Sequence, residues 1–468
     1  MTDKIGAMVV CYGSRGVSMV DAFLRSSYDV ELYIADKQKN PFNARVAKEH
    51  AIIPDLNVPD IVKFAKKFED KIDLAIVCPE GPIIAGVRDE IESATDIPVV
   101  CPTKEFALEE SKVQQRELLA GCCLDANPRF KVFRKSEYGS SVKGPLYAWL
   151  DEFDNQVAVK PDRPGYGKGV GVWGDHFQNR EQLFAHFMGI YENDAVIIEE
   201  KIDGQESSYQ CFCDGKRVVP MPDTRDYKRA FEEDKGPNTG GMGCYRDSGD
   251  ILPFMTHADR KAEEKMVNKL FKKLRGEGTE PGLRGIPLYV AFMHSADGPK
   301  ILEINSRGGD PESPTVISTI KDDFVELCFS MIEGKLRKVR FEDKAAVLIY
   351  KVPPAYGGFD KAYPDKVAAG EIGKPVDLSG AKALFKEYGH DVCIYPGSME
   401  LRGGNTYALG SRAVACIGKS DSIEEAREIA LKATKATKGG GLWYREDIAS
   451  KEHIAKSVAH MKRLRGAV

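Results

Sequence analysis

Short apolar runs alternate with helical stretches along the first hundred residues of the chain. Four of the runs predict strands, at residues 7–12, 29–36, 73–79 and 97–102. Three stretches with helical periodicity lie between them, at residues 17–27, 60–68 and 83–93. Alternation of strands and helices at this spacing is typical of βαβ units around a parallel sheet. The pattern therefore predicts a doubly wound α/β domain over residues 1–103.

Beyond this region the pattern favours antiparallel strands. A helix over residues 104–121, capped by Thr103 and closed by Gly121, comes first. Six strand-like runs follow, at residues 155–161, 169–174, 195–202, 207–222, 287–295 and 299–305. One amphipathic helix, at residues 259–278, presents a single apolar face. These elements predict a second domain over residues 104–330.

The remaining sequence is again rich in strands and ends in helical stretches. Residues 331–448 have a mixed α/β pattern that closes with a helix beginning at Ser422. Residues 449–468 are helix-like, and the sequence assigns no role to them. We therefore expect a C-terminal domain over residues 331–448, followed by a tail.

Composition narrows the class of protein. The 468 residues include 67 Lys and Arg against 71 Asp and Glu, and the resulting net charge of −4 does not favour nucleic acid or an anionic membrane. No apolar run is long enough to span a membrane, and the N-terminus lacks the features of a signal peptide. The 11 cysteines lie in strand-like and helix-like segments, as expected for free thiols in a reducing compartment. We expect a cytoplasmic protein without nucleic-acid or membrane partners, either a monomer or a weak homo-oligomer.

Glycines and lysines suited to phosphate follow the run at 155–161. Lys160 ends this run, and Lys168 lies between Gly167 and Gly169. Glycines let backbone N–H groups approach a polyphosphate, while lysines supply positive charge. The loop lacks the spacing of a Walker motif, and an ordinary hairpin is the alternative interpretation.

The predicted buried strand at 195–202 ends in two acids. Glu199, Glu200 and the backbone near Ile202 suit an adenine edge and ribose hydroxyl groups. An exposed strand end with charged, solvent-facing residues is the alternative.

The run at 299–305 carries the strongest chemical signal. Alternation places Glu303 and Asn305 on one face of the strand and Leu302 on the other. Carboxylate and amide oxygens suit Mg²⁺, which keeps its remaining positions for water and phosphates. Arg307 follows, with a planar guanidinium for a carboxylate or phosphoryl oxygen. A solvent-facing strand side that runs into a turn is the alternative.

A long polar segment, residues 223–243, connects two of the predicted strands. It contains Asp226, Lys228 and Arg229, followed by the glycine-rich string GPNTGGMG. Loops of this length are usually functional or disordered. We expect an irregular loop that closes over a substrate.

The chain opens on a strand, a glycine turn and a helix, as nucleotide-binding domains often do. The turn Gly13-Ser14-Arg15-Gly16 is one glycine short of a dinucleotide fingerprint, although Asp36 stands where a ribose-binding acid would. A dinucleotide-binding dehydrogenase is therefore one alternative.

At these segments the sequence resembles the ATP-grasp superfamily and, within it, the phosphoribosylamine–glycine ligase family. RDYKRAFEEDKGPNTGGMGCY is similar to that family's D-x-K-R…GPNTGGMG-x-Y, and LEINSRGGDPE to its E-x-N-x-R-[FL]-GDPE. CPEGPIIAGVRD, GSRAVACIG and LWYREDI resemble further family segments, and the resemblance runs from about residue 5 to residue 448. It implies an ATP-grasp fold in which a small lobe, about residues 127–197, is inserted into the domain 104–330.

The resemblance also implies a reaction and the residues that serve it. In such ligases a substrate carboxylate attacks the γ-phosphate of ATP, and an amine then displaces phosphate from the acyl phosphate. For this family the substrates are glycine and 5-phosphoribosylamine, with Mg²⁺ or Mn²⁺ on Glu303 and Asn305.

The ATP-binding residues implied are Lys160, Lys168, Gly167, Gly169, Glu199, Glu200 and Ile202. The catalytic residues implied are Arg307, Asp226 and Lys228. The substrate-binding residues implied are Gly13, Ser14, Arg15, Glu80, Arg229, Pro237, Asn238, Thr239, Gly240, Gly241 and Asp310, with the helix N-terminus after Gly13 facing a sugar phosphate.

The chain departs from the family pattern near the expected acceptor site. GSRGVS replaces GGREHA at the opening turn, ADKQKNPFNARVA stands where PGN is usual, and Gly308 replaces a Phe or Leu. A paralogous ATP-grasp ligase with a different acceptor amine is therefore the main alternative. A non-catalytic nucleotide sensor is a further one, which the presence of Glu303 and Asn305 opposes.

Overall fold

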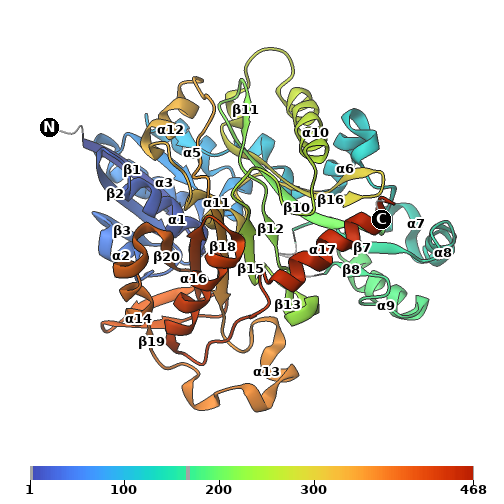
Figure 1. The fold of residues 1–468 in the computed structure, drawn as a ribbon. Helices are drawn as coiled ribbons and strands as arrows, with labels where there is room; N and C mark the ends of the chain where they lie inside the picture. Colours follow the sequence, from blue (N-terminus) through green and yellow to red (C-terminus); the bar gives the residue numbers. More distant parts are fainter. Residues whose placement is uncertain (1–3, 165–168, 467–468) are drawn as a thin grey trace.

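The N-terminal part of the chain folds around a five-stranded parallel sheet with the order β3-β2-β1-β4-β5 (Figure 1). The computed structural model describes residues 4–164 and 169–466. The strands are β1 (Lys4–Cys11), β2 (Asp29–Asp36), β3 (Glu49–Ile52), β4 (Leu74–Val77) and β5 (Val99–Val100). The sequence pattern missed β3, because its four residues are polar or only partly buried.

Helices cover both faces of this sheet, as the doubly wound pattern predicts. They are α1 (Gly13–Leu24), α2 (Asn43–Val46), α3 (Val58–Lys67), α4 (Glu80–Ile84) and α5 (Val87–Ala94). Side chains of β1 alternate between the faces, so Met8 packs in the cluster with α3 and α5 and Val9 in the cluster with α1. The single helix expected at 83–93 is divided at Gly86, whose φ is 84°.

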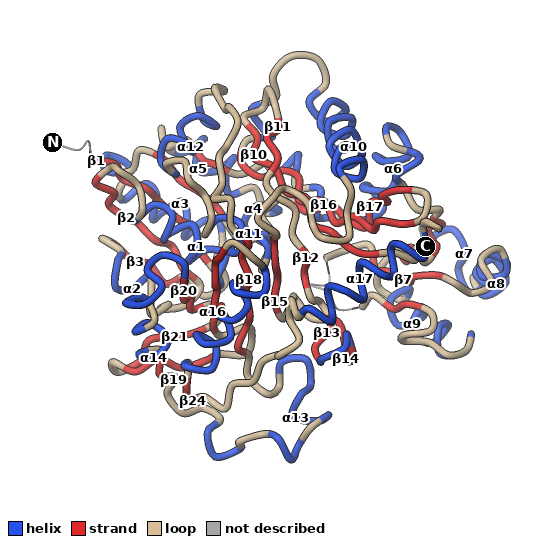
Figure 2. The backbone as a smooth tube through the Cα atoms, viewed as in Figure 1, coloured by secondary structure: helices blue, strands red, loops and turns tan. Residues whose placement is uncertain are grey.

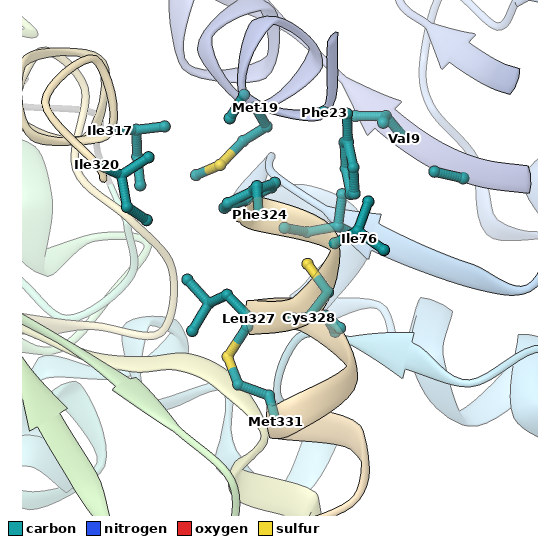
Figure 3. Close-up of a cluster of buried hydrophobic side chains, with 14 of the residues drawn as sticks. Val9, Met19, Phe23, Ile76, Ile317, Ile320, Phe324, Leu327, Cys328 and Met331 are labelled. Carbon is teal, nitrogen blue, oxygen red and sulfur yellow. The ribbon is translucent and has the colours of Figure 1, made fainter. Parts of the chain in front are cut away.

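A later segment of the chain completes the core on the α1 face. Helices α11 (Glu312–Ile317) and α12 (Phe324–Ile332) return to the N-terminal sheet, and the rings of Phe23 and Phe324 meet edge to face at 4.8 Å (Figure 3). Cys328 and Met331 of α12 lie in the same buried cluster. The end of the predicted 104–330 segment is therefore packed against the domain predicted for residues 1–103.

Two antiparallel sheets follow in the middle of the chain. The small sheet, β6-β9-β7-β8, contains β6 (Phe130–Phe133), β7 (Val157–Pro161), β8 (Gly171–Val172) and β9 (Val196–Glu200). Its helices are α7 (Lys135–Tyr138), α8 (Lys143–Asp151) and α9 (Arg180–Tyr191). The central sheet, β11-β10-β16-β17, contains β10 (Gln205–Cys213), β11 (Val218–Pro220), β16 (Gly285–Ser295) and β17 (Gly298–Asn305). Helix α10 (His257–Arg275) packs on it through Val267, Leu270 and Phe271, as its apolar face predicts.

The helix expected over residues 104–121 is shorter than predicted. Two 3-10 turns, Lys104–Phe106 and Leu108–Glu110, precede α6 (Lys112–Cys122). The Ser111 side chain, not that of Thr103, caps α6 by accepting a hydrogen bond from Gln114 N. Gly121 lies inside the helix.

The C-terminal sheet joins segments that are far apart in sequence. Its order is β12-β15-β18-β23-β20, with β12 (Arg225–Asp226), β15 (Gly243–Arg246), β18 (Ala345–Lys351), β20 (Val392–Pro396) and β23 (Val414–Ser420). The other elements of this region are α16 (Ile423–Ala436) and the pairs β19 (Val376–Asp377) with β24 (Lys438–Gly439) and β21 (Met399–Arg402) with β22 (Asn405–Ala408). Because β15 pairs with β18, the polar segment 223–243 is built into this sheet.

Two peripheral segments complete the molecule. The part around α13 (Phe359–Ala362), α14 (Ser379–Ala383) and α15 (Phe385–Tyr388) consists of loops and short helical turns, and α13 projects from the body (Figure 2). The tail forms α17 (Lys451–Leu464), and the Arg465 guanidinium beyond it donates to both carboxylate oxygens of Asp259 at 2.9 and 2.8 Å. The tail to which the sequence assigned no role is thereby fastened to α10.

The structure bears on two expectations drawn from composition. No helix in residues 4–164 and 169–466 is long and apolar enough to cross a membrane. All 11 cysteines, each in a described part of the chain, are free thiols, as predicted.

Gly16 gives a direct test of packing between α1 and β1. An added Cβ would lie 2.1 Å from Cys11 Sγ. We expect Gly16→Ala to reduce the free energy of unfolding by roughly 1–3 kcal/mol through overpacking, measured by denaturant titration. A Cys11→Ala background removes the opposing sulfur and should recover most of the loss. Equal destabilisation in both backgrounds would contradict this explanation.

Candidate active site

One large cavity, of about 650 Å³, lies where the N-terminal domain, the two middle sheets and the C-terminal sheet meet. This volume is in the range of small-molecule binding sites. It gathers side chains from distant segments, from Tyr12 near the start of α1 to Arg412 before β23.

Most of the residues predicted for the site line this cavity. They are Arg15, Glu80, Lys160, Glu199, Glu200, Ile202, Asp226, Lys228, Arg229, Asn238, Thr239, Gly240, Glu303, Asn305, Arg307 and Asp310. Five other predicted residues lie outside the lining: Gly13, Ser14, Gly169, Pro237 and Gly241. Gly167 and Lys168 fall outside the described residues.

Lys160 and Glu199 form a buried ion pair at the wall between the two middle sheets. Lys160 Nζ donates to Glu199 Oε2 at 2.7 Å, and Arg116 donates to both Glu199 oxygens at 2.6 and 3.1 Å. Burial raises the pKa of Glu199, but the two cations outweigh it and hold that pKa below its usual value. Burial lowers the pKa of the Lys160 ammonium. The Glu199 carboxylate is thus engaged by two protein cations, although it also faces the cavity.

Glu303 and Asn305 project from β17 without protein partners. Neither side chain forms a hydrogen bond or ion pair with any residue in the described parts of the chain, although Asn305 is 8% exposed. A β-bulge shifts the register between Ala291 and Phe292 of β16, opposite Leu302. Leu302 consequently lines the cavity beside Glu303, which corrects its predicted place on the opposite face.

This pair fits a divalent cation that shares its coordination with a ligand. Among the described residues, no group of three or more His, Cys, Asp or Glu side chains is arranged to hold a metal ion alone. One carboxylate and one amide oxygen are a suitable protein contribution for Mg²⁺, which completes its shell with water and phosphate oxygens. The polar atoms of both side chains are accessible from the cavity, where a cation and its ligand can reach them.

Asp226 is buried at the end of β12 in a group of charged residues. It lies 3.8 Å from Lys228 Nζ, and the Lys228 ammonium forms a close ion pair with Glu206. Burial, together with the charges of Glu312 and Glu206, raises the pKa of Asp226 to about 8. Its Oδ1 atom is buried without a hydrogen-bond partner among the described residues. An acid with this pKa can accept a proton near neutral pH.

The guanidinium of Arg307 lies between two carboxylates. Its Nη2 donates to Glu109 Oε1 at 2.8 Å, and its Nε lies 3.3 Å from Glu80 Oε2. The same Glu80 oxygen accepts from Arg15 Nη2 at 2.8 Å. Burial raises the pKa of Glu80, but Arg15 and Arg307 outweigh it and bring that pKa to about 2.

The polar segment 223–243 differs from the irregular loop that the sequence predicts. It contains the hairpin β13 (Arg229–Phe231) and β14 (Lys235–Asn238) between β12 and β15. Arg229 Nη2 donates to Asp175 Oδ2 of the small lobe at 2.9 Å, which connects the hairpin to that lobe across the cavity. Arg412 donates to the Gly240 carbonyl and to the Asp310 carbonyl, the latter at 2.6 Å. The segment is therefore held from two sides over the site.

The departures from the family pattern do not line the cavity, and several of them are packed in the interior. Gly16 makes room for Cys11, and Val17 is fully buried in the cluster under the C-terminal sheet. Asn40, from the segment that replaces PGN, donates to the Pro396 and Gly397 carbonyls at 2.8 and 3.1 Å. Asp36 is 1% exposed and accepts from Asn43 Nδ2 at 2.8 Å, so it is not placed to bind a dinucleotide ribose.

Several lining residues were missed by sequence reasoning. They are Tyr12, Glu109, Lys112, Gln115, Asp175, Glu206, Arg225, Tyr289, Glu312 and Arg412. Glu312 and Arg412 lie within the strings NSRGGDPE and GSRAVACIG, which could have drawn attention to them. Glu109 and Gln115 were hidden in the segment expected to form one helix, as was Arg116, which lies outside the lining but binds Glu199.

Comparisons with known proteins assign the chain to one family. Two domain models of one family match the chain: Phosphoribosylglycinamide synthetase, N domain, over residues 5–110, and its ATP-grasp (A) domain over residues 112–313. A phosphoribosylamine–glycine ligase of Pyrococcus furiosus is 36% identical over 466 residues, covering 99% of this chain and 98% of its own. One of Methanocella arvoryzae is 35% identical over 462 residues, covering 98% and 99%.

Solved structures share the fold. The crystal structure of phosphoribosylamine–glycine ligase from Thermotoga maritima aligns with a TM-score of 0.71 and 24% identity, covering 95% of this chain and all of that one. The biotin carboxylase domain of the Hydrogenobacter thermophilus 2-oxoglutarate carboxylase, solved with MgADP, aligns with a TM-score of 0.66 and 15% identity, covering 100% and 96%. The predicted fold class, a multidomain ATP-grasp fold with an N-terminal doubly wound domain and a C-terminal mixed α/β domain, is confirmed.

Proposed function

This chain belongs to the phosphoribosylamine–glycine ligase family, and we propose that it joins glycine to 5-phosphoribosylamine at the expense of ATP. The carboxylate of glycine attacks the γ-phosphorus and ADP leaves. The amine nitrogen then attacks the carbonyl carbon of the glycyl phosphate, and phosphate leaves as glycinamide ribonucleotide forms. The observation that carries this proposal is one cavity lined by Lys160, Asp226 and Arg307 together with Glu303 and Asn305. The last two side chains have no hydrogen-bond or ion-pair partner among the described residues.

The nucleotide is assigned to the wall between the two middle sheets. Lys160 would hold the phosphates of ATP, supported by its position beside Glu303 on the cavity wall. Glu200 and the backbone near Ile202 would take the nucleoside, while Glu199 keeps the Lys160 ammonium in place. Lys168, Gly167 and Gly169 remain predicted phosphate ligands.

A divalent cation, Mg²⁺ or Mn²⁺, would be held by Glu303 and Asn305. When bound, it supplies positive charge that stabilises the charge developing on the phosphates of ATP. The two side chains offer one negative and one neutral oxygen donor on the same wall, which fits such an ion.

The glycine and its acceptor are assigned to the part of the cavity lined by Arg307 and Asp226. Arg307 would orient the glycine carboxylate, because a guanidinium matches a carboxylate geometrically. Asp226 would accept the proton that the attacking amine loses, with Lys228 beside it. Asn238, Thr239, Gly240 and Asp310 would contact the acceptor and exclude water, which would otherwise hydrolyse the acyl phosphate.

A product assay tests this function. We expect purified enzyme to form ADP and glycinamide ribonucleotide in equal amounts from ATP, glycine and 5-phosphoribosylamine, followed by coupled ADP release and mass spectrometry. Omission of glycine or of the amine should abolish product. Turnover with another amine but none with 5-phosphoribosylamine would instead support the paralogous ligase.

A further inference from the structure

We propose that Arg15 is a positioning residue, which fixes Arg307 through Glu80 and the Gly308 carbonyl, and that it is not a ligand of the acceptor's phosphate group. The inference deepens the proposed function, on which it rests for the role of Arg307. The opening turn of the chain then serves to position Arg307, whereas its glycine pattern suggests that it binds a phosphate.

The Arg15 guanidinium is already occupied by the protein. Its side chain is 6% exposed. Nη1 donates to the Gly308 carbonyl at 2.7 Å, and Nη2 donates to Glu80 Oε2 at 2.8 Å. Nε is buried and has no acceptor among the described residues. An arginine that binds a phosphate usually presents two N–H groups to it, and both Nη atoms of Arg15 donate to protein acceptors instead. The Nη atoms of Arg307 also donate within the protein, but the Arg307 side chain is 16% exposed against 6% for Arg15, so Arg307 remains more accessible to a ligand.

Both partners of Arg15 bear directly on Arg307. The Glu80 oxygen that accepts from Arg15 lies 3.3 Å from Arg307 Nε. Gly308 is the next residue after Arg307, so a bond to its carbonyl fixes the backbone beside the arginine. Glu109 holds the far side of the Arg307 guanidinium at 2.8 Å. The charges alternate along Arg15, Glu80, Arg307 and Glu109, and this arrangement keeps two buried arginines compensated.

The glycine at position 308 is part of the same arrangement. An added Cβ would lie 2.2 Å from Ser313 Oγ and 3.2 Å from Ser313 Cβ, so a side chain at position 308 requires Ser313 to move. Gly308 does not line the cavity, and its departure from the family's Phe or Leu therefore does not enlarge the acceptor pocket.

Kinetic and binding measurements on Arg15→Lys separate the two roles. A lysine keeps the positive charge but is shorter and lacks the planar guanidinium whose two Nη atoms reach Glu80 and the Gly308 carbonyl. We expect kcat/KM for glycine to fall at least tenfold, while the Kd of ribose 5-phosphate, which carries the acceptor's sugar phosphate, stays within threefold of the wild-type value. Glu80→Gln should have a similar effect on glycine, and the double variant should lose little more than either single variant, since both break one chain of contacts.

Arg25→Lys is the matched control. Arg25 follows α1, bonds the Ile317 carbonyl at 3.0 Å and Asp21, and lies outside the cavity lining. It should alter the melting temperature without changing kcat/KM for glycine.

Two results would overturn the proposal. One is a tenfold or larger weakening of ribose 5-phosphate binding in Arg15→Lys, and the other is an unchanged kcat/KM for glycine in a folded variant. Turnover of the wild-type enzyme with 5-phosphoribosylamine tests the proposed function separately. The variant and the wild type are compared with whichever acceptor amine the enzyme turns over. The proposal for Arg15 can therefore fail while the proposed function holds, and the reverse is also true.

Discussion

Replacing Glu303 with glutamine is expected to lower kcat by roughly 10²–10³-fold, the usual effect of removing one group that stabilises transition-state charge. The Glu303 carboxylate lines the cavity from β17 and has no partner in the described parts of the chain. Glutamine keeps the shape and one oxygen but removes the negative charge that attracts a divalent cation. Coupled ADP release over a range of Mg²⁺ concentrations should show both a lower maximum and a higher requirement for metal.

The neighbouring Asn305 supplies the control for this prediction. Asn305→Asp retains an oxygen donor and should stay within about tenfold of wild type, whereas Asn305→Leu, which removes that donor, should resemble Glu303→Gln. The melting temperature of Glu303→Gln should fall only slightly, because no hydrogen bond or ion pair is lost and only the longer-range attraction to Lys160 and Lys228 is weakened. A variant that kept more than a third of the wild-type kcat with unchanged Mg²⁺ dependence would falsify the metal-site assignment.

The common face of Glu303 and Asn305 could be predicted from sequence because strand periodicity is a local property. Glu303 and Asn305 are two residues apart in an extended segment, and both reach the cavity. The position of Leu302 could not be predicted in the same way. It depends on a register shift opposite Ala291 and Phe292, which lie on another strand. A bulge is a property of the paired strands, and one strand's pattern does not contain it.

The prediction of one helix over residues 104–121 was also wrong because contacts with distant residues decide the local structure. Thr103 and Ser111 are both suitable N-cap residues, and the local sequence does not decide between them. Contacts from elsewhere favour Ser111: its hydroxyl donates to Asp162 Oδ1 at 2.7 Å, and Ser306 Oγ donates to the Phe106 carbonyl at 2.9 Å. The resulting 3-10 turn, Leu108–Glu110, brings Glu109 to Arg307, a contact that no local pattern indicates.

The opening turn shows where a family resemblance is insufficient. Its departures suggested a changed acceptor site, since they lie in a segment that the family uses near its substrate. The structure places Val17 in the cluster beneath the C-terminal sheet and Gly16 against Cys11, away from the cavity. Substitutions at such positions are compensated by their packing partners, which only the three-dimensional arrangement identifies.

Replacing Asp226 with asparagine is expected to lower kcat by about 10²–10⁴-fold and to change the pH dependence of what remains. The raised pKa, about 8, means that most of this carboxyl is protonated at neutral pH and that the basic form accumulates as pH rises. Wild-type kcat/KM should therefore increase through pH 8 and then level off. Asparagine cannot accept the proton, so the residual activity of the variant should lack this increase.

The same pKa predicts the sign of a stability effect. Between its ordinary value of 3.8 and about 8, the carboxyl is ionised in the unfolded chain but protonated in the folded protein. Unfolding then releases a proton, so the contribution of Asp226 to stability decreases as pH rises across this window and is constant above it. Asp226→Asn lacks that decrease, and its melting temperature relative to wild type should rise from pH 4 to pH 8.

Asp223→Asn is the matched control, because Asp223 is a fully buried acid three residues away that does not line the cavity. Burial also raises its pKa, and Arg260 Nη1 donates to its Oδ1 at 2.6 Å. Its substitution should change stability but leave the increase of kcat/KM through pH 8 intact. If Asp226→Asn kept that increase as well, the proton acceptor would have to be another group. The raised pKa of Asp226 would then reflect only its burial beside Glu312 and Glu206.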